Sequence, residues 1–279
     1  HRDLHSFPTR RSSDLSVWQR QSVQVLAGRP VSAPDVQNVT ALAYFFWDDD
    51  RIDSLFYTIE SAFLVTRQVC GALPCILVVN RVTPRIEAFC VSQGIVIQID
   101  KTLTGGVPRM NIDCVETLYS RFETEYVMVI QSDGFPLRQG IGEFVGKYDY
   151  IGAPWGRASW YTHLIFPYPQ YCVGNGGFTV RSKRLCEMSS HYYRRKYRFL
   201  PYGYWVADDV FYCRTLPRFE RRCRKTMTYA PPEVAGRFAF ETNHEFYPKD
   251  GDMPFGFHSA RGFEHVMKDF GDQIGRAHV

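Results

Sequence analysis

Asp133 is a residue whose type and setting suggest chemistry. The apolar run 126–130 stops at Gln131 and Ser132, the acid follows, and Gly134 lets the chain turn away. In α/β proteins, ligands bind just past the carboxyl ends of the strands. A carboxylate at that place suits a hard divalent cation such as Mg²⁺ or Mn²⁺, which prefers oxygen ligands. The alternative is an aspartate that caps the turn before Gly134.

A second acidic pair, Asp208 and Asp209, lies in "ADDV". A carboxylate near a reacting hydroxyl can take its proton as a general base. Aspartates also favour the first turn of a helix, so both could simply begin the helix "DVFYCRTL". His258 follows the apolar run 255–257, where a histidine is either a ligand or part of the core.

The segment "VGNGGF", residues 173–178, surrounds Asn175 with glycines. Gly176 and Gly177 would allow the backbone to approach a sugar ring closely, or would form a tight turn into a strand at 178–181. The segment lacks the Gly-Lys-Ser/Thr ending of a phosphate-binding P-loop.

Aromatic side chains fill residues 155–171 and predict either a wall on which a sugar stacks or a packed loop. They are Trp155, Trp160, Tyr161, Phe166, Tyr168 and Tyr171.

The segment 191–205 mixes five basic residues with aromatics. It could bind single-stranded nucleic acid, although a solvated amphipathic helix or a loop facing a diphosphate fits better. Asp48, Asp49 and Asp50 are expected to form a solvated loop between a strand and a helix, or else to lie near a nucleotide base.

The elements that must position these residues alternate along the chain. Apolar runs predict strands at 40–47, 75–79, 95–99 and 126–131. Between them, helical periodicity or helix end signals occur at 52–63, 84–92 and 111–122. Alternating strands and helices predict a largely parallel sheet covered on both faces.

The length, composition and net charge of the chain limit the functions that it can have. The chain has 279 residues, 45% of them hydrophobic, with 33 basic and 29 acidic side chains, so a folded α/β protein is expected. Residues 1–15 and 273–279 back-translate into sequencing adapters and are expected to be artefacts. They contain four arginines and two aspartates, so the remaining chain carries about +2, which is no signature of nucleic-acid binding. We expect a leader or linker at 16–38 and a single domain at 39–272.

The eight cysteines contain no C-x-x-C pair, which argues against a zinc ribbon or a redox motif. Buried, reduced cysteines are expected, and disulfides stay possible. No run of about 18 apolar residues suggests a membrane span. Cytoplasmic and membrane-associated locations both remain open.

Five blocks in this order, "QSDGF", "YDYIGAPW", "VGNGGF", "ADD" and "FGFH", resemble a family filed as a domain of unknown function and compared with nucleotide-sugar glycosyltransferases of the GT-A fold. The segment "APPEVAGRFAFE", residues 230–241, is also similar. The resemblance covers residues 125–258 and extends more weakly from residue 40. Two departures occur: Gln131 stands where GT-A enzymes often have a first acid, and Asp208 stands where the family usually has Glu.

The resemblance implies a GT-A-like, mainly parallel sheet flanked by helices, and transfer of a sugar from a nucleoside diphosphate to a glycan or other hydroxyl acceptor. Asp133 and His258 would hold Mn²⁺ or Mg²⁺, or Asp133 would face the diphosphate without metal. Asp209 would be the general base, and Asp208 would orient a partner or bind acceptor. The donor and sugar would contact Gln131, Ser132, Asp133, Gly134, Trp155, Asn175, Gly176 and Gly177.

Two other functions stay open. Without the first acid, the chain could be a non-catalytic protein that binds glycans or nucleotide sugars. Asp133 and Asp209 could also flank a glycosidic bond, because a glycoside hydrolase needs two carboxylates. A nucleic-acid polymer is not an expected partner.

Overall fold

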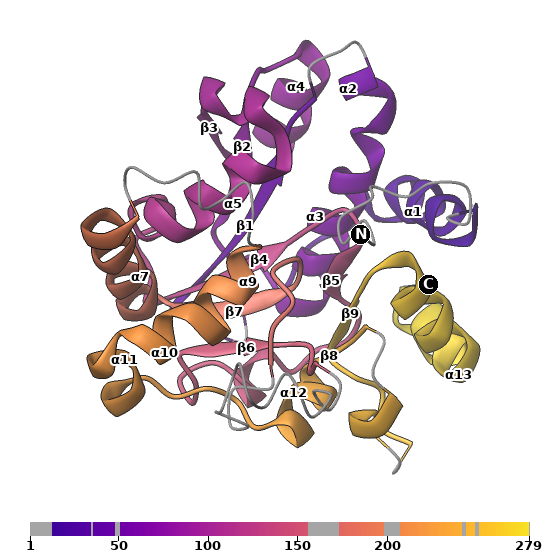
Figure 1. The fold of residues 1–279 in the computed structure, drawn as a ribbon. Helices are drawn as coiled ribbons and strands as arrows, with labels where there is room; N and C mark the ends of the chain where they lie inside the picture. Colours follow the sequence, from indigo (N-terminus) through magenta and orange to yellow (C-terminus); the bar gives the residue numbers. More distant parts are fainter. Residues whose placement is uncertain are drawn as a thin grey trace.

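The computed structural model describes residues 13–34, 36–47, 51–155, 173–197, 207–241, 244–248 and 251–278. A six-stranded sheet with the order β3-β2-β1-β4-β7-β6 forms its centre (Figure 1). The strands are β1 (Val39–Phe45), β2 (Cys75–Val79), β3 (Val96–Ile99), β4 (Tyr126–Ile130), β6 (Tyr150–Gly152) and β7 (Thr179–Ser182). The first four run parallel, and β7 is antiparallel to both of its neighbours, β4 and β6. The predicted mixed, mainly parallel α/β fold is confirmed.

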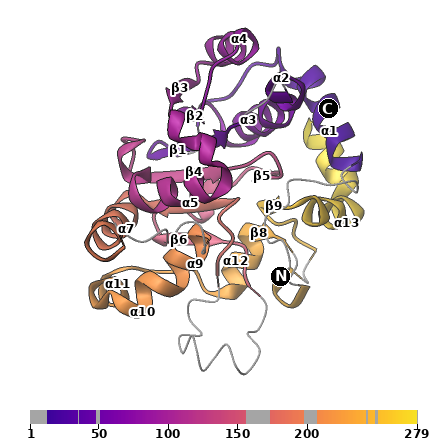
Figure 2. The same cartoon turned by 45° about the horizontal axis from the view of Figure 1, so that its top comes forward.

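The residues of β1 alternate between two apolar clusters, as a sheet covered on both faces requires. Ala41 and Ala43 pack in the cluster that contains α3 (Tyr57–Cys70) and α4 (Pro84–Gln93). Leu42 and Tyr44 pack in the cluster that contains α5 (Gly106–Glu116) and α7 (Lys183–Lys196). Figure 2 shows helices on both sides of the sheet.

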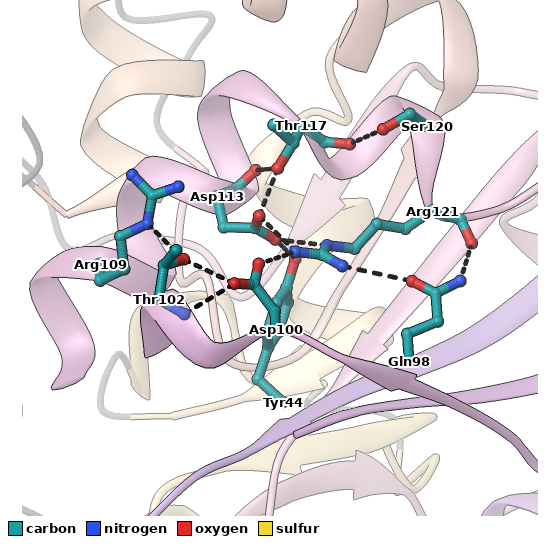
Figure 3. Close-up of polar contacts among 9 residues, drawn as sticks. All are labelled: Tyr44, Gln98, Asp100, Thr102, Arg109, Asp113, Thr117, Ser120 and Arg121. Atoms are coloured by element: carbon teal, nitrogen blue, oxygen red, sulfur yellow. Dashed lines mark hydrogen bonds and ion pairs between the residues drawn. The ribbon is translucent and has the colours of Figure 1, made fainter. Parts of the chain in front are cut away.

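A buried polar network fixes the carboxyl ends of β1 and β3 against α5 (Figure 3). Oδ2 of Asp113 accepts hydrogen bonds from the Tyr44 hydroxyl and from Nε of Arg121, both at 2.6 Å. Arg121 also donates to Asp100, which follows β3, over 2.6 Å. Asp113 is only 1% exposed. Its other oxygen, Oδ1, accepts from Arg121 and from the Thr117 hydroxyl, so both oxygens of a carboxylate that would be costly to bury alone have partners.

Three predicted segments differ from the structure. The helix predicted at 52–63 is split at Phe56 into α2 (Arg51–Leu55) and α3. The helix predicted at 111–122 begins earlier and ends at Glu116, where a 3-10 turn, Leu118–Ser120, follows. The leader or linker predicted at 16–38 contains α1 (Ser13–Leu26), which contacts α3.

Helix α1 was not predicted because its buried face is only partly apolar. That face consists of Leu15, Gln19, Ser22 and Leu26, at the spacing of one side of a helix. Two of the four are polar, so the sequence shows weak periodicity there. Both α1 and the last helix, α13 (Ala260–His278), reach into the segments expected to be adapter-derived.

A second, small sheet has the order β5-β9-β8. Its strands are β5 (Gly134–Pro136), β8 (Ala239–Phe240) and β9 (Gly256–His258), of two or three residues each. Strands this short leave almost no pattern in a sequence, and none of them was predicted. Helices α1 and α13 contact each other beside this sheet (Figure 1).

After α7, the described segment that leads to β8, residues 207–238, is mostly helical. It contains α9 (Asp208–Val210), a π-helical turn (Phe211–Thr215), α10 (Leu216–Phe219), α11 (Arg221–Thr226) and α12 (Pro232–Phe238). Three further 3-10 turns are Lys101–Gly105, Ile141–Glu143 and His244–Phe246. In the part of the chain that the structure describes, no helix combines the length and apolar character needed to span a bilayer.

The seven cysteines in the described ranges are all buried and unbridged. Burial raises the pKa of Cys75 and of Cys90 to about 12. For these seven residues the expectation of reduced, buried side chains is confirmed, while Cys172 lies outside the described residues.

Candidate active site

The candidate site begins at a hairpin after β4. The backbone N–H of Gln131 donates to the Gly134 carbonyl over 2.8 Å, and that of Gly134 donates back over 3.1 Å. This mutual pair leaves Ser132 and Asp133 as the two turn residues. The Asp133 side chain is 27% exposed, so its carboxylate lies at the surface rather than inside the core.

β9 places His258 directly beside this turn, because Gly134 pairs with His258 in the small sheet. Nε2 of His258 lies 3.9 Å from Oδ1 of Asp133. On the other side of the ring, Nδ1 lies 3.2 Å from Oε1 of Glu241, which follows β8. Burial acts to lower the pKa of His258, but the Glu241 contact and the charges of Asp133 and Asp209 outweigh it and raise that pKa.

The glycine-rich segment joins Asp209 to the same region. Asn175 has a φ of 65°, and its backbone N–H donates to Oδ2 of Asp209 over 2.8 Å. Oδ1 of Asp209 accepts from the Val210 N–H over 2.7 Å. Oδ1 of Asn175 accepts from the Gly177 N–H over 3.3 Å. Its buried Nδ2 has no hydrogen-bond partner among the described residues.

Gly176 and Gly177 are needed because side chains of the site occupy the space that a Cβ would fill. A Cβ on Gly176 would lie 2.2 Å from Oδ1 of Asp208, and one on Gly177 would lie 2.0 Å from Nε2 of His258. Both distances are far inside van der Waals contact. The two glycines therefore let the Asp208 carboxylate and the His258 ring lie directly against the backbone. Contact with a sugar ring stays a prediction.

Asp208 is engaged inside the protein. Its Oδ2 accepts a 2.6 Å hydrogen bond from Arg181, whose side chain is fully buried. The guanidinium carbon of Arg181 lies 4.6 Å from the centre of the Tyr212 ring. Of the two roles suggested by the sequence, this ion pair suits the orienting one, because it anchors the start of α9 next to Asp209.

Helix α1 contacts both the acidic turn and the strand β5 that follows it. The Gln19 side-chain amide donates to the Ser132 carbonyl. The neighbouring Trp18 ring stacks on Phe135 of β5 with ring centroids 5.9 Å apart. A segment expected to be a linker is thus one of the supports of the Asp133 turn.

Of the predicted aromatic wall, the structure describes Trp155, which packs against Gly174 and beneath the guanidinium of Arg214, 4.8 Å from its ring centre. The remaining wall residues 160–171, the acidic cluster 48–50 and the end of the basic aromatic segment, 198–205, lie outside the described residues.

The structure thus brings Asp133, His258 and Asp209 to one region, together with the Gln131 side chain, which lies near Gly177. Sequence reasoning missed Glu241, Gln19 and Arg181. Glu241 ends a segment that the resemblance singled out, and Arg181 ends the possible strand at 178–181, but nothing in their spacing marks them. Among the described residues, no three His, Cys, Asp or Glu side chains meet in a way that could hold a metal ion by themselves.

Comparison with solved structures finds similar glycosyltransferases at low identity. The mannosyltransferase Ktr4p from S. cerevisiae, in complex with GDP, is 10% identical, with 75% of this chain and 78% of that chain covered and a TM-score of 0.43. Core-mannan synthase A from Aspergillus fumigatus, in an Mn/GDP form, is 9% identical, with 76% of each chain covered and a TM-score of 0.47. Mouse xyloside xylosyltransferase 1 is 8% identical, with 79% and 97% covered and a TM-score of 0.45.

No curated protein matches the sequence. A family model does match, over residues 102–258, which is more than half of the chain. That span contains the acidic turn, the glycine-rich segment, the Asp208–Asp209 pair and His258. The chain therefore belongs to the family described as "Protein of unknown function (DUF5672)".

Proposed function

We propose that this chain is a glycosyltransferase that moves a sugar from a nucleoside diphosphate to an acceptor hydroxyl. The observation that carries the proposal is the convergence of Asp133, His258 and Asp209 from three separate segments. Nε2 of His258 lies 3.9 Å from Oδ1 of Asp133, and the charge of Asp209 helps to raise the pKa of His258. The group lies past the carboxyl end of β4, where α/β sheets bind their ligands.

Asp133 and His258 would face the diphosphate. One contact of His258 fits a divalent cation. A metal-binding histidine usually bonds to a carboxylate, a backbone carbonyl or water through its second ring nitrogen, and Nδ1 of His258 contacts the Glu241 carboxylate in this way. Since two side chains do not complete a coordination shell, phosphate oxygens of the donor would supply further ligands, as they commonly do for Mg²⁺. A bound cation would offset the negative charge that builds on the leaving diphosphate.

Asp209 would be the general base. Its two oxygens accept hydrogen bonds from the N–H groups of Asn175 and Val210, which fix the orientation of the carboxylate. The acceptor oxygen would attack the anomeric carbon while the bond from that carbon to the diphosphate breaks and its electron pair leaves with the phosphate. Asp209 would take the acceptor proton. The buried Nδ2 of Asn175, which has no hydrogen-bond partner among the described residues, would donate to a sugar hydroxyl.

The test is a panel of UDP-, GDP- and CDP-sugars with and without Mn²⁺, scored by donor binding and by release of nucleoside diphosphate. Wild type is compared with Asp133→Asn and with Glu123→Gln, whose side chain is 95% exposed. We expect one nucleotide class to bind and to be cleaved. Asp133→Asn should lose donor binding, and Glu123→Gln should behave as wild type.

Three results would count against the proposal. Binding to free glycans with no response to any nucleotide sugar would indicate a glycan-binding protein. Cleavage of a glycoside without nucleotide would indicate a hydrolase. Donor binding that is unchanged in Asp133→Asn would remove Asp133 from the site.

A further inference from the structure

A strongly basic surface lies at the end of α7 and on α10 and α11. We call residues 194–196 and 218–225 the basic corner. The two parts meet where Arg195 donates to Glu220 over 2.8 Å. Both views show α7 on the same side of the molecule as α10 and α11 (Figures 1 and 2).

The basic corner contains eight basic residues and one acid, Glu220, a net charge of +7. The whole chain carries only +4, so the rest of it is slightly acidic. The low total charge, which is no signature of nucleic-acid binding, conceals this separation. A concentration of one charge sign on one surface creates a local potential that attracts the opposite charge.

Only some of these basic side chains bind to other groups of the protein. Arg224 donates to the carbonyls of Pro217 and Arg218, and Arg194 and Arg195 pair with glutamates. Four other side chains are exposed and form no ion pair with any described residue: Lys196, Arg221, Arg222 and Lys225. The last three lie on one face of α11, opposite the buried Cys223.

Phe219 lies in the middle of these cations. It is 59% exposed and is the only aromatic among the large hydrophobic side chains that are exposed in the described ranges. The Arg218 guanidinium lies 5.3 Å from its ring centre. An exposed aromatic costs solvation free energy that a buried one does not. Arg218 precedes Phe219 in the sequence, and Arg221 and Arg222 follow after Glu220.

This combination favours a lipid surface over nucleic acid. Proteins that bind single strands stack successive bases on several aromatic rings, whereas Tyr192, Tyr193 and Phe211 beside the corner are buried. A peripheral membrane site needs basic side chains for the anionic headgroups and an apolar side chain that enters the interface. The basic corner has both in one short segment.

We infer that the basic corner is a docking site for an anionic membrane surface, with Phe219 inserting among the lipids. The inference does not rest on the proposed sugar transfer. It does place the candidate base near a membrane, because residues 209–219 run through consecutive helical turns, about 15 Å of helix.

The test is co-sedimentation of the full chain with vesicles of phosphatidylcholine alone or with 30% phosphatidylglycerol. Wild type is compared with Phe219→Ser and with the triple variant Arg221→Gln/Arg222→Gln/Lys225→Gln. The control is Lys101→Gln/Lys147→Gln/Lys268→Gln, which removes the same charge from exposed lysines elsewhere. Circular dichroism and melting temperature confirm that each variant is folded.

We expect binding only to the anionic vesicles, with weaker binding at 0.5 M salt. The α11 triple variant should bind about a hundredfold more weakly, at roughly fivefold per cation. Phe219→Ser should lose about tenfold. The lysine control should stay within a fewfold of wild type. Equal binding to both vesicle types, or an equal loss in the two triple variants, would overturn the inference. Binding to single-stranded oligonucleotides but not to vesicles would assign the surface to nucleic acid instead.

Discussion

The N–H of Asn175 donates to Oδ2 of Asp209 over 2.8 Å, and through this bond the glycine-rich segment fixes the carboxylate at the start of α9. The other oxygen is fixed by the N–H of Val210. Two bonds from two different segments leave the carboxylate little freedom to rotate. A general base benefits from such a fixed orientation, because proton transfer requires it to be within hydrogen-bond reach of the acceptor hydroxyl.

Asp209→Asn is therefore expected to separate binding from transfer. Sugar transfer should fall about 10²- to 10⁴-fold, the contribution typical of general acid–base catalysis, while donor affinity changes little. An amide can accept only one of the two N–H bonds well, so stability should also fall, by about 1–3 kcal/mol. Single-turnover kinetics, donor titration and urea unfolding measure the three effects. Transfer within tenfold of wild type would remove Asp209 as the base.

Gly177→Ala is expected to displace the His258 ring. The added Cβ would lie 2.0 Å from Nε2 of His258 and 2.8 Å from Oε1 of Gln131, so one of these side chains must move. We expect a loss of about 1–3 kcal/mol in stability, as overpacking usually costs, and donor binding at least tenfold weaker. Gly28→Ala is the control, because no atom lies within 4 Å of its added Cβ. Thermal unfolding and donor titration check both variants, and a Gly177→Ala protein with wild-type affinity would contradict the geometry.

Gln19→Leu tests whether α1 supports the acidic turn. The change removes the hydrogen bond to the Ser132 carbonyl while keeping a side chain of similar size. Loss of one such bond should cost about 0.5–1.5 kcal/mol, and donor binding should weaken because Asp133 follows Ser132. The exposed Gln24 provides the matched control, Gln24→Leu. If both variants bind donor like wild type and only stability differs, α1 has a structural role alone.

The sequence predicted the first half of the sheet well and the site only in outline. β2 coincides with its apolar run, and α4 ends at Gly94, whose φ of 62° explains the glycine. Such elements are local. An apolar run, the Thr83 side chain that accepts from the Ile86 N–H at the start of α4, and a left-handed glycine each act within a few residues. Asp133, Asp209 and His258 were singled out for their residue types and blocks, but no local rule predicts that they meet.

What could not be predicted depends on contacts between distant segments. Glu241 and His258 meet because two strands of two and three residues pair in the small sheet. Gln19 is 113 positions away from Ser132. Arg181 resembles a surface arginine in the sequence, yet its side chain is fully buried against Asp208. Only the folded structure shows that these polar residues have partners.

Asp149, in the block "YDYIGAPW", is expected to make the stability of the protein depend on pH in the acid range. Its carboxylate is 1% exposed and accepts bonds from Arg184 at 2.5 and 2.6 Å, from the Ser182 hydroxyl and from the Thr228 N–H. Burial acts to raise the pKa of Asp149, but the bonds from Arg184, Ser182 and Thr228 outweigh it and lower that pKa. A lowered pKa stabilises the folded protein above the unfolded-state value of about 3.9, and this stabilisation is lost as the pH falls through the folded-state value.

Asp149→Asn should therefore cost about 1–3 kcal/mol at neutral pH, because the buried amide can accept hydrogen bonds on one side only and turns its own N–H groups towards the donors on the other side. The difference from wild type should shrink steadily below about pH 4. Glu143→Gln is the comparison, because Glu143 is 52% exposed in its pair with Arg138 and such pairs contribute at most about 1 kcal/mol. Urea unfolding from pH 3 to pH 7 measures the free energy of unfolding of all three proteins. A difference between wild type and Asp149→Asn that does not vary with pH would show that the carboxylate contributes by its shape rather than by its charge.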